Sequence, residues 1–360
     1  MNEAGPREHD IVIRVEGRAG RITLNRPAAL NSLTYDQIGA IDRALTAWEH
    51  DPAVELVLLD GAGERGLCAG GDVLAMYAHR DDIGYAKTFW RDEYHLNLRI
   101  SRYPKPYVAF MDGIVMGGGI GLSAHASHRI VTERSALAMP ETTIGLVPDV
   151  GGTFLLASAP GRMGEYLGLL GERMGSGDAL CMGFADTHVD SARLPDLAAA
   201  LIDPDGSPVG VTIAEYAGAP TRVVHAARQP EIDGLFDAPT VADIRARLAS
   251  SELEWAQKAV HALDQRSPLC LSLTLAAVRR VREQASLAAA QASLHQAEQS
   301  RRLAEAVVAQ RESERRYAQA ELARIESLAD RGHASQEQLD RARTAAETAE
   351  AALQAARVQV

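Results

Sequence analysis

The chain has 360 residues, of which 46% are hydrophobic and 5% aromatic, enough apolar material for one large or two moderate domains. Its formal net charge of −11 argues against nucleic acid or an anionic membrane surface as the main partner. Its three cysteines lack C-x-x-C spacing and cannot all pair within one chain, so we expect reduced thiols. Because we find no signal-peptide core and no long apolar run, the sequence predicts a cytoplasmic protein without a membrane span.

Strand and helix patterns alternate through the first part of the chain. The expected elements are strands at residues 11–15 and 21–25, a helix at 34–50, a strand at 54–59, a helix at 82–101 and a strand at 106–111. Thr34 is the expected N-cap of the first helix. Such alternation predicts an α/β fold.

Two glycine-rich turns and two acids stand out in this part of the chain. The turns lie at residues 68–72 (CAGGD) and at 117–119, and the acids, Glu141 and Asp149, follow the second turn. Backbone N–H groups at such turns can bind a developing negative charge on oxygen, so the combination indicates acyl chemistry. The alternatives are ordinary packing turns and solvated surface acids.

Four motifs in order then identify a resemblance: LNRPAALNSL (24–33), GLCAGGDV (66–73), GIVMGGGIGLS (113–123) and MPETTIGLVPDVGGTF (139–154). Over about residues 10–287 the chain resembles the enoyl-CoA hydratase/isomerase (crotonase) superfamily, and within it the 3-hydroxyisobutyryl-CoA hydrolase branch. The resemblance implies an α/β spiral of ββα units followed by helices. It also implies hydrolysis of a short 3-hydroxyacyl-CoA, with 3-hydroxyisobutyryl-CoA from valine breakdown as the expected substrate. The only CoA involved belongs to the substrate, and no cofactor is expected.

The resemblance also implies roles for individual residues. The N–H groups of Gly71 and Gly118 would hold the thioester oxygen. Glu141 would act as nucleophile or as general base, and the sequence does not separate the two. Asp149 would hold the substrate hydroxyl or help to activate water.

Further positions follow from the same comparison of motifs. Glu93 matches a substrate-contacting glutamate, and Ala29 with Leu30 matches a region that lies along CoA. Hydratases carry a second catalytic glutamate at the position of Gly121, so its absence disfavours the alternative of a hydratase or isomerase. Cys68 is expected to be a packed thiol. The histidines show no metal-binding pattern, so no metal is expected.

The second half of the chain becomes helical. Helices are expected at residues 153–158, 164–170, 178–182, 241–248, 253–263 and from 267 onward, and a loop or linker at Pro204–Pro220. We therefore divide the chain into a catalytic core at residues 1–203, a helical region at 204–286 and a further domain at 287–360.

Residues 287–360 carry an alanine-rich heptad repeat. Its clearest seam is Leu339, Ala342, Ala346, Ala349, Leu353 and Ala356; the seam continues upstream through Leu294 and Ala297, and arginines 301, 311 and 315 interrupt it. Gly332 and Ser335 predict a helix end and a helix start, so we expect an antiparallel coiled-coil hairpin with its tip near 330–335. This segment resembles the hairpin of periplasmic adaptor proteins. Through it the chain could form a homo-oligomer or bind a coiled-coil partner, and the alternative function is a non-catalytic assembly module.

Overall fold

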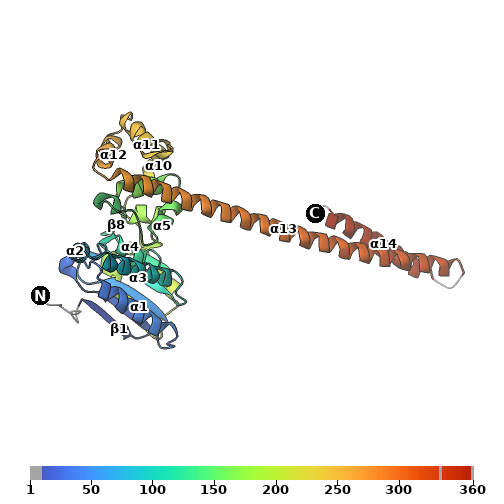
Figure 1. Ribbon diagram of the computed structural model, residues 1–360. Coiled ribbons are helices and arrows are strands. Elements are labelled where there is room, and N and C mark those ends of the chain that lie inside the picture. Colours follow the sequence, from blue (N-terminus) through green and yellow to red (C-terminus); the bar gives the residue numbers. More distant parts are fainter. Residues whose placement is uncertain (1–9, 332–334, 358–360) are drawn as a thin grey trace. The chain divides into compact units, whose positions relative to one another are not determined.

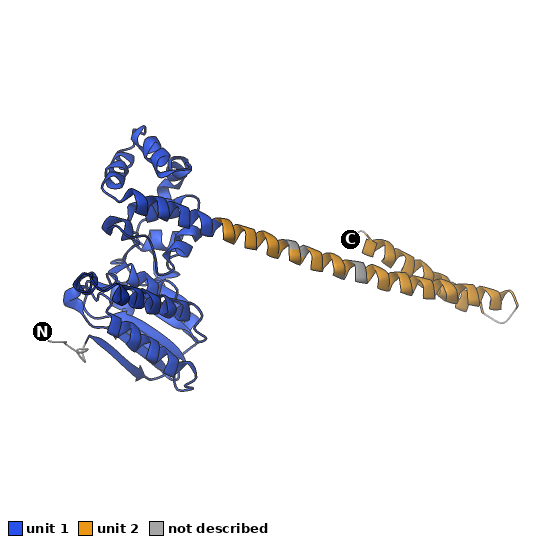
Figure 2. Ribbon diagram, in the orientation of Figure 1, with its two compact units in different colours: residues 1–282 blue, residues 283–360 orange. Residues whose placement is uncertain are grey.

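The computed structural model describes residues 10–331 and 335–357, without the side chains at 294, 297, 303, 305 and 306. Its internal contacts divide the chain between Arg282 and Glu283 into unit 1 and unit 2 (Figure 2). This division lies near the boundary expected at residue 287. The finer division expected at residue 204 stays a prediction.

The described residues of unit 1 form two sheets. The larger has the strand order β1-β2-β3-β5-β7-β9, and the smaller has the order β4-β6-β8. β1 and β2 form the expected antiparallel hairpin, and every other pairing is parallel. The strands are β1 Ile11–Glu16, β2 Ala19–Leu24, β3 Leu56–Gly61, β4 Gly66–Cys68, β5 Tyr107–Met111, β6 Ile114–Met116, β7 His128–Val131, β8 Ala136–Ala138 and β9 Thr187–His188. From β3 to β8, consecutive strands alternate between the two sheets, which is the expected spiral.

Strand β3 shows why the larger sheet is buried on both faces. Val57 and Leu59 belong to the main core, whereas Leu56 and Leu58 belong to a second apolar cluster. Successive side chains of a strand point to opposite faces, so the continuous apolar run of β3 serves both.

Two helices cover the main-core face, α1 Tyr35–Glu49 and α3 Ile83–Ser101 (Figure 1). Thr34 and Gln37 form a capping box at the start of α1, as the sequence predicts for Thr34. Ile41 and Leu45 of α1 are fully buried, one turn apart on the inward face.

The second cluster lies under helices α8 Leu194–Ile202 and α9 Val209–Tyr216. The prediction of a linker at residues 204–220 is therefore wrong in its centre. Val209 and Ile213 are buried one turn apart, which supplies the apolar face of a helix. The flanking glycines and prolines concealed this short pattern, and Pro208 stands just before the first residue of α9.

Most of the remaining α-helices of unit 1 lie where the sequence predicts them, whereas α2 Val73–Ala78 and α10 Gln229–Phe236 were not predicted. The others are α4 Gly118–Ser123, α5 Gly152–Ser158, α6 Met163–Leu170, α7 Ser176–Cys181, α11 Val241–Ala249, α12 Glu254–Asp264 and the start of α13 Pro268–Ala329. Buried residues of α6, α10, α11, α12 and α13 join the same core as the strands. The helices after residue 220 thus complete the core.

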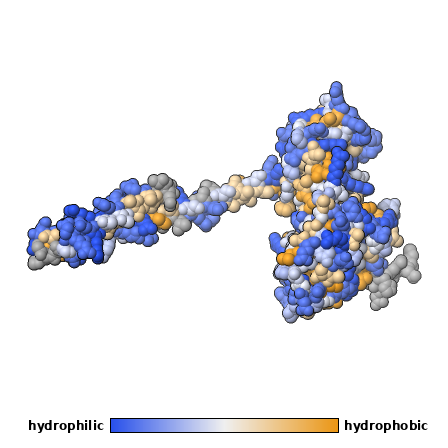
Figure 3. Space-filling model, turned by 180° about the vertical axis from the view of Figure 1, so that it is seen from behind, coloured by the Kyte–Doolittle hydropathy of each residue, from blue (hydrophilic) through white to orange (hydrophobic). Residues whose placement is uncertain are grey.

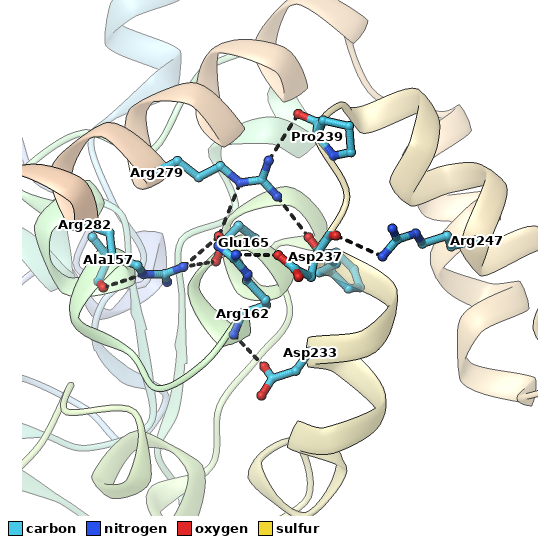
Figure 4. A network of polar contacts seen from close by, with 10 residues as sticks. Ala157, Arg162, Glu165, Asp233, Asp237, Pro239, Arg247, Arg279 and Arg282 are labelled. Carbon is cyan, nitrogen blue, oxygen red and sulfur yellow. Dashed lines mark hydrogen bonds and ion pairs between the residues drawn. The ribbon is translucent and has the colours of Figure 1, made fainter.

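A buried carboxylate fastens the first turns of α13 to α6 (Figure 4). Glu165 is fully buried, and its two oxygens accept hydrogen bonds of 2.7 and 2.9 Å from Nη1 of Arg282. Nη1 of Arg162 lies 3.0 Å from Oε1 of Glu165, and Nε of Arg279 lies 3.5 Å from it. A buried charge with several cationic partners is costly to leave unpaired, so this cluster fixes the first turns of α13 within unit 1.

Unit 2 consists of the rest of α13 and of α14 Gln336–Arg357, which lies beside it (Figure 1). Among the described residues, three ion pairs join the two helices: Arg315–Glu350 at 3.5 Å, Arg343–Glu326 at 3.7 Å and Arg357–Glu312 at 2.8 Å. Residue numbers fall on α13 as they rise on α14, so the two helices are antiparallel, as expected. Arg315, which interrupts the apolar seam, is paired with Glu350 across the hairpin.

The seam itself is buried on α14. Ala346, Leu353 and Ala356 are the buried residues of this helix, and each is a seam position in the sequence. Ser335 and Gln338 cap its start reciprocally, as the sequence predicts for Ser335. The expected helix end at Gly332 lies outside the described residues. The visible surface of the hairpin in Figure 3 is largely hydrophilic, as it should be when the seam faces inward.

Candidate active site

The smaller sheet brings three separate parts of the chain to one edge. Strands β4, β6 and β8 are parallel neighbours, so their carboxyl ends lie together. Gly71, Gly118 and Glu141 each follow one of these ends within a few residues. This edge is where parallel sheets commonly carry functional groups.

The turn after β4 is held by Leu33. Leu33 N–H donates to the Gly70 carbonyl at 2.8 Å, and Asp72 N–H donates to the Leu33 carbonyl at 2.9 Å. These bonds form a parallel bridge between Leu33 and Gly71. In such a bridge the N–H of Gly71 itself points away from Leu33 and stays free for another acceptor.

The turn after β6 leads directly into α4. Gly117 has a φ of +47°, a left-handed value that glycine adopts without strain. Gly118 is the first residue of α4, so its N–H has no acceptor within the helix. A Cβ on Gly118 would lie 3.3 Å from the Gly71 nitrogen, which shows how closely the two turns approach. The N–H groups of Gly71 and Gly118 can therefore both donate to one oxygen atom.

Three carboxyl groups surround these turns. Glu93 is 3% exposed and Glu141 is 6% exposed, and the described part of the chain supplies no hydrogen-bond partner to Oε1 of Glu93 or Oε2 of Glu141. A Cβ on Gly118 would lie 2.7 Å from Oε1 of Glu93, and one on Gly117 would lie 3.2 Å from Oε1 of Glu141. Buried polar atoms without partners are rare unless a ligand or water supplies the bond.

The environment of the carboxyl groups raises their pKa values. Burial raises the pKa of Glu141 to about 8, and the charge of Asp149 acts in the same direction. Burial, together with the charges of Asp149 and Glu141, raises the pKa of Glu93 to about 8. Burial also raises the pKa of Asp149, although a hydrogen bond from Tyr94 opposes this rise. Such shifted groups are typical of catalytic sites.

Tyr94 is a site residue that the sequence analysis did not identify. Its hydroxyl donates a hydrogen bond of 2.8 Å to Oδ2 of Asp149. Asp149 comes from the segment between Glu141 and α5, so this bond ties that segment to α3. The only signal in the sequence is that Tyr94 adjoins Glu93.

Asn97 is a second residue that the sequence analysis missed. It is 5% exposed, and neither Oδ1 nor Nδ2 has a hydrogen-bond partner among the residues that the structure describes. A Cβ on Gly121 would lie 2.8 Å from Nδ2 of Asn97 and 2.8 Å from Cβ of Val150. Asn97 lies four residues after Glu93 on α3 and therefore on the same helix face.

The other expected residues lie around this centre. Ala29 is exposed in a 3-10 turn, Pro27–Ala29, and the Leu30 carbonyl accepts a 3.0 Å bond from Ala69 N–H. Leu30 has a φ of +53°, a strained value for a residue with a side chain. The segment expected along CoA therefore lies against the CAGGD turn.

Cys68 and Asp72 have structural environments. Burial raises the pKa of the Cys68 thiol to about 12, which keeps it protonated and unsuited to attack. Asp72 caps α2 through a bond from Ala75 N–H and pairs with Arg26 at 2.9 Å. The charge of Arg26 is thus already balanced within the protein.

Metal and cofactor requirements stay predictions. Glu133, His188 and Asp190 offer ligand atoms within 4.8 Å of one another, away from the edge just described. The Glu133 carboxylate already accepts bonds from both N–H and hydroxyl of Ser191. The expectation of a metal-free enzyme rests on the sequence alone.

Comparison with known proteins shows the family. The enoyl-CoA hydratase/isomerase family model matches residues 19–295, and the chain belongs to this family. Among curated proteins, the mitochondrial 3-hydroxyisobutyryl-CoA hydrolase of Gallus gallus is 38% identical over 288 residues, which cover 77% of this chain and 74% of that protein. The protein of the same name from Homo sapiens is 36% identical over 275 residues, covering 74% of this chain and 71% of that protein.

Two solved structures are also similar. A carnitinyl-CoA dehydratase from Mycobacterium thermoresistibile is 47% identical, with a TM-score of 0.73 over 76% of this chain and 80% of that one. An enoyl-CoA hydratase from Rhodobacter sphaeroides is 49% identical, with a TM-score of 0.71 over 76% and 81% of the two chains. The likeness therefore covers unit 1, and these relatives carry names of both hydrolases and hydratases.

Among the described residues, no helix combines the length and the apolar character that crossing a bilayer requires.

Proposed function

We propose that this chain hydrolyses a short 3-hydroxyacyl-CoA thioester, with 3-hydroxyisobutyryl-CoA as the substrate. The observation that carries the proposal is the position of Glu141, beside two free backbone N–H groups at the edge of the smaller sheet. The names of the curated relatives support the same activity.

In the proposed mechanism the thioester oxygen lies between the N–H groups of Gly71 and Gly118. These donors stabilise the negative charge that forms when the carbonyl carbon is attacked, and losing one such donor typically costs about 3–4 kcal/mol. Water would solvate the negatively charged oxygen poorly at this position, so the two backbone N–H groups are the main source of its stabilisation.

Glu141 supplies the attacking atom in one of two ways. Its carboxylate can attack the carbonyl carbon and expel CoA thiolate, leaving a mixed anhydride that water then hydrolyses. Alternatively, it can take a proton from water as the water attacks directly. In both routes water is consumed, the C–S bond breaks and the thiolate leaves with a proton. Asp149, fixed by Tyr94, holds the substrate hydroxyl or orients the water.

The alternative of a hydratase has support in the names of the two similar structures. Adding water across a double bond needs a second acid or base, and position 121 carries no side chain. Asn97 and Val150 fill the space in which a side chain at Gly121 would begin. This packing favours hydrolysis.

The role of unit 2 and the location of the protein are also proposals. We propose that the hairpin pairs with a second copy or with a partner coiled coil, in addition to the activity of unit 1. The expected cytoplasmic location stays a prediction, and the curated relatives named above are mitochondrial.

Release of free CoA from 3-hydroxyisobutyryl-CoA tests the proposal, with hydration of crotonyl-CoA measured beside it. We expect steady thiol release by the wild type, loss of at least about 10³-fold in Glu141→Gln, and no hydration. Hydration without thiol release would instead assign the hydratase activity. A folded chain with neither activity would leave the assembly function of unit 2 as the remaining candidate.

A further inference from the structure

Helices α3 and α4 face each other through two matched pairs of residues. Glu93 faces Gly118, and one turn further along each helix Asn97 faces Gly121. The first pair lies where the thioester oxygen is proposed to bind. Three residues of an α-helix advance about 4.5 Å, so the second pair lies about that far along α4 from the first.

This spacing matches the chemistry of the substrate class. In a 3-hydroxyacyl thioester, two C–C bonds and one C–O bond separate the carbonyl carbon from the hydroxyl oxygen. A thioester oxygen held at Gly118 therefore leaves the hydroxyl within reach of the space at Gly121. Gly121 offers no side chain there, and of the two residues that pack against it, Asn97 and Val150, Asn97 supplies the polar group.

The amide of Asn97 suits a hydroxyl group. A hydroxyl both donates and accepts a hydrogen bond, and the amide supplies an acceptor in Oδ1 and donors in Nδ2. Both amide atoms are buried without a partner among the described residues, as is one carboxyl oxygen each of Glu93 and Glu141 in the same site. Leaving a buried donor or acceptor unpaired is costly, and beside the carboxyl groups of the candidate site a bound ligand can complete the bonds of the Asn97 amide.

We propose that Asn97 binds the 3-hydroxyl group of the acyl chain and selects hydroxylated thioesters over their deoxy analogues. This inference rests on the proposed hydrolase function and adds a specificity residue to it. Asp149, held by Tyr94, then remains available to orient the hydrolytic water.

The test compares two thioesters that differ only in this hydroxyl, 3-hydroxyisobutyryl-CoA and isobutyryl-CoA. The measured quantity is kcat/KM for 3-hydroxyisobutyryl-CoA divided by kcat/KM for isobutyryl-CoA, in the wild type, Asn97→Leu and Asn97→Ala. We expect the ratio to fall at least about tenfold in both variants, because kcat/KM drops for the hydroxylated substrate alone. Thr274→Val is the matched control, since Thr274 Oγ1 is also buried without a partner but lies on α13. Its ratio should equal that of the wild type.

A binding measurement makes the result independent of turnover. In a Glu141→Gln background, the Kd of each thioester is measured with and without Asn97→Leu. We expect the hydroxylated thioester to lose its affinity advantage when Asn97 is replaced.

The outcomes separate the two proposals. Thiol release by the wild type with an unchanged substrate ratio in both Asn97 variants would overturn the role of Asn97 and leave the hydrolase standing. Absence of thiol release from either thioester by the wild type would overturn the hydrolase and, with it, this inference. If an Asn97 variant fails to fold by circular dichroism while Thr274→Val folds, the amide is structural and the inference is wrong.

Discussion

Ionisation of Glu141 should control the rate. Because its pKa is raised to about 8, Glu141 is largely protonated at neutral pH, and either proposed role needs the carboxylate. We expect kcat/KM to rise with pH and to level off above about 8, as a profile between about pH 5 and 9 would show. Asp149→Asn removes a charge that raises this pKa, so the profile of that variant should shift to lower pH. A rate already constant above pH 5 would contradict the assignment.

The same pKa shift links activity to stability. The folded protein binds the Glu141 proton more tightly than the unfolded chain does, because the folded pKa exceeds the ordinary value of 4.5. The fold therefore loses stability as the pH rises from 4.5 through about 8. Glu141→Gln should melt at a higher temperature than the wild type above pH 8, and at a similar temperature near pH 4.

The hydroxyl of Tyr94 should matter for the rate but little for the fold. The hydrogen bond from Tyr94 orients Asp149 and lowers the pKa of its carboxyl group, and Tyr94→Phe removes this bond. We expect kcat to fall by about tenfold, which corresponds to the free energy of one good hydrogen bond. Tyr85→Phe is the control, because Tyr85 lies on the same helix and stacks on His79 instead. Equal rates for Tyr94→Phe and the wild type would show that Asp149 does not need this bond.

The sequence predicted some residues of the candidate site and missed others for a physical reason. Gly71, Gly118 and Glu141 stand in motifs whose local backbone shape the sequence itself determines. Tyr94 and Asn97 lie near the candidate site because their face of α3 packs toward α4 and Asp149. That orientation depends on tertiary packing, and no local pattern in the sequence reports it.

At the scale of elements, the cluster around Glu165 should be a main support of unit 1. Glu165→Ala removes the buried anion that pairs with Arg162, Arg279 and Arg282. We expect the free energy of unfolding to fall by about 3–5 kcal/mol. Chemical denaturation followed by tryptophan fluorescence measures this loss. Glu254→Ala is the control, because its pair with Lys258 is exposed, and its midpoint should match the wild type.

The same elements show what the sequence can predict about the fold. The periodicity of α1 and of β3 is strong enough to predict each element without tertiary information. Helix α9 was missed because its apolar face is short and lies among prolines and glycines. The partners of Glu165 on α13 are over a hundred positions away, so only the folded structure reveals the cluster.

For the whole molecule, the candidate site and the hairpin belong to different units. Leu353 is fully buried in the hairpin, and Leu353→Asp should separate α14 from α13 and lower the helical circular-dichroism signal. Every proposed site residue lies in unit 1, so the rate of CoA release should stay within about twofold of the wild type. Gln354→Asp, on the exposed side of α14, is the matched control. A large fall in rate for Leu353→Asp alone would show that the site depends on the hairpin.

The two antiparallel helices of unit 2 could be predicted from sequence because a heptad pattern repeats one local rule. Of the heptad positions that the sequence assigns to the seam, α14 buries Ala346, Leu353 and Ala356, whereas Leu339, Ala342 and Ala349 are half-buried. No comparable rule gives the order of strands in the spiral, which follows here from the family resemblance.

The spiral of unit 1 has a consequence for the order of events during refolding. Its proposed site needs the ends of β4, β6 and β8, which lie far apart in the chain, whereas the hairpin joins segments that are near one another. Distant contacts form late because closing long loops costs entropy. After dilution from denaturant, helical signal should therefore return before thiol release does, and the delay between them would time the closure of the smaller sheet.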